Sequence, residues 1–134
     1  MAEGIPRTIR FVSAKVDVVA GESCTAVVEV ESQGVGTFTG TAQGGVTEQD
    51  QLRAVARATS DALSDAFEAQ GAIVRVIGVQ LVDAVAQTAV VVSLAASKGA
   101  HMKTLLGISD GTSDPAKATA LGVLNATNRF LGKD

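Results

Sequence analysis

The chain has 134 residues and a formal net charge of -3, and 46% of its residues are hydrophobic although Trp and Tyr are absent. This length suits one globular domain, 1–134, with a core of small aliphatic side chains. No cluster of Lys or Arg could follow a phosphate backbone, which excludes nucleic acid as a partner. No apolar run approaches the about 20 residues that span a bilayer, and no leader pattern is recognisable, so we expect a soluble, cytoplasmic protein.

The first part of the chain alternates between apolar and polar residues, as β-strands do. Strands are predicted over 7–20, 25–32 and 35–42, with turns at Gly21 and Gly34 between them. The face of the first strand that is predicted to be buried consists of Val12, Ala14, Val16 and Val18.

An amphipathic helix is predicted to follow these strands. Thr47 and Asp50 have the spacing of an N-terminal cap, and Gln70 with Gly71 is expected to end the helix. Apolar residues recur between them at three- and four-residue steps, so one face should pack on the sheet. That face consists of Leu52, Val55, Ala56, Thr59, Ala62, Leu63, Ala66 and Phe67, and the predicted polar face of Arg53, Arg57, Ser60, Asp61, Ser64 and Asp65.

The same order of elements is predicted a second time. Strands are expected over 73–82, 88–95 and 101–108. Ser113-Asp114-Pro115 is typical of a helix start, because Ser or Asp caps free amides and Pro fits the first helical position. Gly132 is expected to end this second helix.

Two repeated units follow from this order, the first over about 7–71 and the second over about 72–132. Thr25 and Thr88 begin similar strands 63 residues apart, Asp50 and Asp114 are 64 apart, and Gly40 and Gly107 are 67 apart. The predicted fold class is therefore α+β, with tandem duplicated β-β-β-α units, pseudo-two-fold symmetry, and antiparallel sheets with helices on one face.

The middle strands of the two units differ in polarity. One face of the first carries Thr25, Glu29 and Glu31, whereas the second, over 88–95, is largely apolar on both faces. A helix covers only one face of a sheet, so the other should be covered by the sister unit or by a second chain. We therefore predict a homodimer.

Two glycine-rich segments before the predicted helices are the candidate ligand sites. Glycine lets the backbone approach a ligand, and free amides at a helix N-terminus attract a carboxylate or phosphate. The alternative is that the glycines only let the chain turn from sheet to helix, which is their commoner role. The candidate ligand-binding residues are Gly40, Gly44, Gly45 and Asp50 in the first unit, and Gly107, Asp110, Gly111 and Asp114 in the second.

The sequence offers no pattern for catalysis. His101 and Cys24 are the only residues of their types, so we expect no metal and no cofactor. Asp110 and Asp114 have no base or nucleophile near them in the sequence, which favours capping over acid–base chemistry. Asn125, Asn128 and Arg129, near the end of the second predicted helix, are expected to bond sheet edges or a partner chain.

The stretch DPAKATALGVLNATNR, 114–129, resembles the last helix of the C-terminal regulatory domain of α-isopropylmalate synthase. The segments LLGIS and TGTAQGG are similar to passages that precede helices in the same domain. The resemblance implies a pair of β-β-β-α units that binds leucine and dimerises. The residues that carry the match in the helix are Asp114, Ala118, Ala120, Leu121, Leu124, Asn125, Ala126, Asn128 and Arg129.

Two functions are consistent with these observations. The first is a non-catalytic sensing or regulatory module that acts as a homodimer and binds a small amino acid or carboxylate. The alternative is a structural or assembly protein that uses the same fold only for oligomerisation or for binding another protein.

Overall fold

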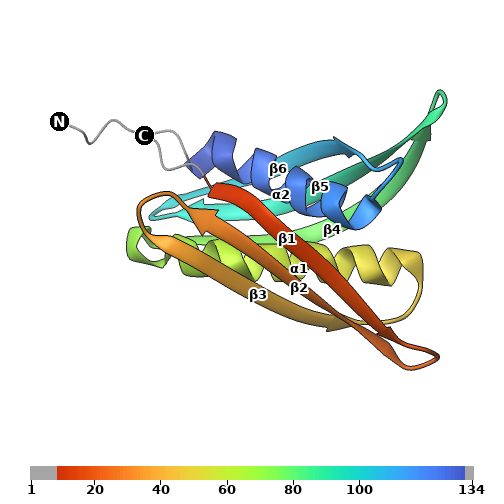
Figure 1. Ribbon diagram of the computed structural model, residues 1–134. Coiled ribbons are helices and arrows are strands. Elements are labelled where there is room, and N and C mark those ends of the chain that lie inside the picture. Colours follow the sequence, from red (N-terminus) through yellow and green to blue (C-terminus); the bar gives the residue numbers. More distant parts are fainter. Residues whose placement is uncertain (1–8, 132–134) are drawn as a thin grey trace.

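The computed structural model describes residues 9–131, without the side chains of residues 69, 84 and 131. The first unit contains β1 (Ile9–Val19), β2 (Ser23–Ser32), β3 (Gly36–Gly44), α1 (Glu48–Ala66) and the short 3₁₀ helix η2 (Glu68–Gln70). The second contains β4 (Ala72–Ala84), β5 (Gln87–Lys98), β6 (His101–Asp110) and α2 (Pro115–Leu131). The predicted duplicated β-β-β-α order is confirmed (Figure 1). Arg7 and Gly132, the predicted first and last residues of these elements, lie outside the described residues.

The helix starts have the predicted caps. The backbone N–H of Asp50 donates to Oγ1 of Thr47 at 3.0 Å, and the backbone N–H of Lys117 donates to Oδ1 of Asp114 at 3.1 Å. Gly71 adopts the left-handed conformation with φ of 70° and ends η2, which extends α1 by one tighter turn. No helix within residues 9–131 is long and apolar enough to cross a membrane.

The two helices lie in a layer between the two sheets (Figure 1). The sheets are antiparallel, with strand orders β1-β2-β3 and β4-β5-β6. Helix α1 packs on β2 and β3 of its own unit and on β4 of the other, while α2 packs on β5 and β6 and on β1. Each helix therefore bridges both sheets, and the sister unit covers the helices rather than the outer face of a sheet.

This sandwich explains why α1 is buried more widely than a surface helix. Ala54, Ala58 and Ser60 are buried in addition to the predicted apolar face. The prediction that Ser60 belongs to the polar face was wrong, because a residue on the far side of α1 from its own sheet meets the second sheet, and Ser60 is 4% exposed.

The strand registers reveal how closely the units correspond. Val28 pairs with Gly40 in the first sheet, and Val92 pairs with Gly107 in the second. The second strands therefore correspond at an offset of 64 residues, so that Thr25 corresponds to Ala89. The predicted offset of 63, from Thr25 to Thr88, was wrong by one residue, which in a strand exchanges the two faces.

The first strand of each unit carries a β-bulge at the corresponding position. The register shifts between Phe11 and Ser13 in β1 and between Val76 and Gly78 in β4. The bulge shifts the alternation by one residue, so Val12, predicted to be buried, is 44% exposed. Val18 was also predicted to be buried and is exposed, whereas Ala14 and Val16 are half-buried.

One side chain of each helix hydrogen-bonds the start of the first strand of the other unit. We call each of these contacts a clamp. Oγ of Ser64 in α1 accepts from the backbone N–H of Val74 at 3.2 Å and donates to its carbonyl oxygen at 3.4 Å. Asn128 in α2 bonds both backbone groups of Ile9 in β1, at 3.4 and 3.2 Å. Ser64 and Asn128 are 64 residues apart, so these clamps occupy equivalent positions in the pseudo-symmetric pair.

Candidate functional site

Three of the four residues predicted as a ligand site in the first unit, Gly44, Gly45 and Asp50, lie together at the start of α1. A Cβ at Gly45 would overlap the carboxylate of Asp50, and a Cβ at Gly44 would lie 3.1 Å from the carbonyl oxygen of Asp50. Gly40 is not part of this group, because it lies under the middle of α1. A Cβ there would overlap the carbonyl oxygen of Ala58.

The start of α2 repeats this arrangement. Asp110, Gly111 and Asp114 lie between the end of β6 and the first turn of α2. The remaining predicted residue, Gly107, lies under the middle of α2, where a Cβ would overlap the carbonyl oxygen of Gly122. Ala58 and Gly122 are again 64 residues apart, so both units use a glycine to bring the helix onto the sheet.

Internal hydrogen bonds occupy the polar groups at the start of α2. The hydroxyl and the backbone N–H of Thr112 donate to Oδ1 of Asp110 at 2.6 and 3.0 Å, and the hydroxyl accepts from the N–H of Thr88. These bonds, that of the hydroxyl above all, lower the pKa of Asp110 below its ordinary value. Packing and internal bonding thus account for the eight predicted residues, whose role in ligand binding stays a prediction.

The outer face of the first sheet is polar. It is made of the residues that alternate with the buried positions of β2, together with their cross-strand partners. Five of these twelve residues are charged and one, Val27, is hydrophobic. They are Arg10, Ser13, Lys15 and Asp17 in β1, Thr25, Val27, Glu29 and Glu31 in β2, and Thr37, Thr39, Thr41 and Gln43 in β3.

The outer face of the second sheet is more apolar, since six of the corresponding twelve residues are hydrophobic. Only two of its twelve residues, Arg75 and Asp110, are charged. We call this set the second outer face: Arg75, Gly78, Gln80 and Val82 in β4, Ala89, Val91, Ser93 and Ala95 in β5, and Thr104, Leu106, Ile108 and Asp110 in β6.

Two large apolar side chains of the second outer face are exposed to solvent in the single chain. Leu106 and Ile108 are 60% and 66% exposed. The apolar surface continues to Ile73 and Met102, which border a hollow of about 250 Å³ on the same face. Ile73, Met102, Leu106 and Ile108, each more than half exposed, thus lie on one face, and gathered exposed apolar side chains mark interaction sites.

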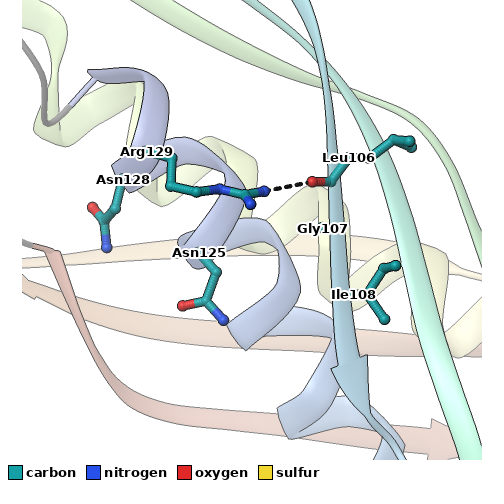
Figure 2. A pocket seen from close by; sticks show the side chains of 6 residues that line it. All are labelled: Leu106, Gly107, Ile108, Asn125, Asn128 and Arg129. Atoms are coloured by element: carbon teal, nitrogen blue, oxygen red, sulfur yellow. Dashed lines mark hydrogen bonds between the residues drawn. The ribbon is translucent and has the colours of Figure 1, made fainter.

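A larger cavity, of about 480 Å³, lies between β6 and the C-terminal half of α2 (Figure 2). Arg129 reaches from α2 to β6, where its Nη2 donates to the carbonyl oxygen of Leu106 at 2.7 Å. The side chain of Leu106 points away from α2. The residues that line this β6–α2 cavity are Leu106, Gly107, Ile108, Asn125, Asn128 and Arg129.

The expected role of the polar residues near the end of α2 is confirmed for two of them. Arg129 bonds the edge strand β6, and Asn128 bonds the start of β1, which is an edge strand of the first sheet. Asn125 is exposed beside them. The cavity itself was not predicted, because its other side comes from β6, and no sequence pattern places that strand against α2.

A smaller cavity of about 250 Å³ lies between α1 and β4. It contains charges of both signs, Arg57, Arg75 and Asp61, beside the buried side chain of Ser60. Its carboxylate lies beside the two cations, whereas the β6–α2 cavity has the cation Arg129 and no acidic residue in its lining.

The described residues hold no cluster of three or more His, Cys, Asp or Glu that could bind a metal ion. Cys24 is buried in β2 and His101 is exposed at the start of β6, far from a second ligand of that kind. The chain matches no protein-family model and no curated protein. The second outer face and the β6–α2 cavity are therefore the features of the structure that bear on function.

Proposed function

We propose that this chain is a non-catalytic binding domain that acts as a homodimer through the second outer face. The observation that carries the proposal is the contrast between equivalent positions of the two sheets. Leu106 and Ile108 stand where the first sheet has Thr39 and Thr41. The same backbone thus carries a surface suited to water on one sheet and a surface suited to burial on the other.

A second copy of the chain is the occupant that best fits this face. The face has few charges, so two copies can meet without burying unpaired ones. Three strands of about ten residues, at 3.3 Å per residue and 4.8 Å between strands, cover roughly 470 Å² per chain. The total of about 950 Å² is close to the lower limit of specific interfaces, so we expect a dimer that dissociates on dilution.

Light scattering combined with size exclusion tests this proposal. The protein should have the mass of a dimer at high concentration, and Leu106→Glu should shift it to the monomer, because each copy would bury a carboxylate without a partner. Thr39→Glu is the matched control at the equivalent position of the first sheet, and it should leave the mass unchanged. A monomer at the highest concentration measured would contradict the proposal, as would equal effects of the two variants.

We also propose that the dimer is a cytoplasmic regulatory module that senses a small amino acid or carboxylate. The resemblance to a regulatory domain supports this role, and so do the two related glycine-rich helix starts, where the positive end of each helix dipole would attract a carboxylate. The test is thermal unfolding with a panel of amino acids and small carboxylates. A compound present at about 100 times its dissociation constant should add about 2.7 kcal/mol of stability.

An assembly protein without a ligand is the second candidate. It is favoured by the close packing at Gly40 and Gly107, since contact with the helices explains these glycines without a bound molecule. Under this function the dimer forms as above, but no compound of the panel shifts the unfolding temperature. The two experiments therefore separate the sensing module from the assembly protein.

A further inference from the structure

Strand β6 has a free edge on the side of the β6–α2 cavity. The backbone N–H of Gly111 donates to the carbonyl oxygen of Thr88, which fixes the alternation of the β5–β6 pair. Gly111 therefore occupies a hydrogen-bonded position, and along β6 every second residue bonds β5 in this way. Leu106 and Ile108 occupy the positions between, so their backbone N–H and C=O groups point away from β5. An edge of this kind can accept a further strand.

Arg129 covers one of these backbone groups. Its bond to the carbonyl oxygen of Leu106 engages one of the five donors of the guanidinium group. Arg129 is exposed, and no carboxylate of residues 9–131 forms an ion pair with it. The cavity thus holds a cation with donors to spare, next to the exposed amide side chain of Asn125 (Figure 2).

The equivalent edge of the first unit has the opposite charge. At the offset of 64 residues, Asp61 corresponds to Asn125 and Asp65 corresponds to Arg129. Both aspartates are exposed on α1, the helix that packs on the edge strand β3, and Asp61 also lines the α1–β4 cavity. An anion is therefore attracted to one edge and repelled from the other, although the backbone of the two edges is the same.

We propose that the β6–α2 cavity binds the C-terminus of a peptide, which adds to β6 as a fourth, antiparallel strand. The terminal carboxylate pairs with the guanidinium group of Arg129, and a peptide N–H replaces that group on the carbonyl oxygen of Leu106. The remaining peptide groups bond the free backbone of Ile108. About three residues of peptide span this stretch of edge.

The charges around the cavity favour the transfer of the guanidinium group from the carbonyl oxygen of Leu106 to the peptide carboxylate. A carboxylate near the C-terminal end of a helix is disfavoured by the helix dipole, which acts there as about half a negative charge. The full charge of Arg129 outweighs it, and a guanidinium group can bond a carboxylate at two points. Main-chain bonds from an added strand supply affinity without requiring one peptide sequence. The proposal does not depend on the dimer, because the edge of a sheet and its outer face are separate surfaces.

Fluorescence anisotropy with a library of labelled hexapeptides, randomised at the last three positions, tests the proposal. Each peptide is made with a free carboxylate and as the carboxamide. We expect members with a free carboxylate to bind, and the carboxamide or the variant Arg129→Gln to weaken binding about 10- to 100-fold, as expected for hydrogen bonds to a charged group. Asp65→Asn, at the equivalent position of the first unit, should leave binding unchanged.

Methylation of the peptide nitrogens separates strand addition from simple carboxylate binding. One methyl group on the nitrogen that bonds Leu106 should weaken binding at least as much as the carboxamide does, because that hydrogen bond is lost. Binding that tolerates methylation at every position, equal binding of carboxylate and carboxamide, or the absence of any binding peptide at millimolar concentration would each overturn the proposal. Circular dichroism of Arg129→Gln establishes that the variant is folded, as its exposed position leads us to expect.

Discussion

The two sheets of this protein agree on their inner faces and differ on their outer faces. Toward the helices, equivalent positions hold the same features: Gly40 and Gly107 under the helices, and a bulge in each first strand. Toward the outside, three threonines and two charged residues of the first sheet correspond to aliphatic side chains in the second. The inner faces therefore specify the fold, while the outer faces carry what distinguishes one unit from the other.

The charges on the helices follow the same division. Asp61 and Asp65 on α1 correspond to Asn125 and Arg129 on α2, and all four side chains are exposed. A duplicated fold gives every site a structural counterpart in the same molecule. Each proposed function can thus be tested against a control residue with nearly the same backbone around it.

The largest effect is expected where the inner faces agree. Gly40→Ala and Gly107→Ala each place a Cβ against a backbone carbonyl oxygen, of Ala58 or of Gly122, and the helix has to move away from the sheet. We expect each variant to lose about 3 kcal/mol in urea unfolding, as in other overpacked cores. Gly78→Ala is the control, because nothing lies within 4 Å of a Cβ there. A large difference between the first two variants would break the equivalence of the inner faces.

The two clamps should be of similar and intermediate importance. Ser64→Ala and Asn128→Ala each leave two backbone groups of a strand start without their side-chain partner. We expect a loss of about 1–2 kcal/mol in the free energy of unfolding for each. Asn125→Ala, exposed on the same helix as Asn128, should change stability by less than about 0.5 kcal/mol. If only one clamp matters, the two unit junctions are not equivalent.

Introducing aliphatic residues of the second outer face into the first sheet should have a smaller effect, and one that is specific to association. Thr39→Leu with Thr41→Ile gives the outer face of the first sheet the residues of the second. We expect little change in stability and some association beyond the dimer in sedimentation velocity at high concentration, because both outer faces then favour burial. If the double variant sediments as the parent protein does, aliphatic side chains at these positions are not sufficient for association.

The smallest effect concerns Asp110 at the edge of the second outer face. The bonds from Thr112 lower its pKa, so its contribution to stability is present above the ordinary pKa of 3.8 and is lost as the pH falls through the lowered value. An NMR titration should place the midpoint of Asp110 below 3.8, and Thr112→Val should return it toward that value. A midpoint unaffected by Thr112→Val would mean that these bonds do not set the pKa.

The fold was predictable because its local signals agree. Strand alternation, the cap at Thr47, the Ser113-Asp114-Pro115 start and the repeated order are all contained in short stretches of sequence. The bulge at Val12 was not predictable, because an extra residue in a strand has no fixed sequence signal. The burial of Ser60 was missed for a different reason, since it depends on a sheet that comes later in the chain.

The candidate sites were predictable only in part. The apolar character of β5 predicted that its outer face is covered by the sister unit or by a second chain. The first alternative was wrong, because the sister unit covers the helices; the second stays a prediction. The glycine-rich helix starts stood out because glycine is conspicuous in a sequence. The β6–α2 cavity did not, because Arg129 and Leu106 become neighbours only when α2 packs beside the edge of the sheet.

The clamp between Asn128 and Ile9 joins residues that are 119 positions apart. During synthesis, the start of β1 leaves the ribosome 119 residues before Asn128 does, so its polar backbone groups wait through the synthesis of both units for this partner. The first unit therefore cannot be completed while the second is still being made, even though all its own strands are present. A nascent chain that stops before α2 exposes the inner side of β1 to water, and chaperones that recognise apolar strands would encounter it there.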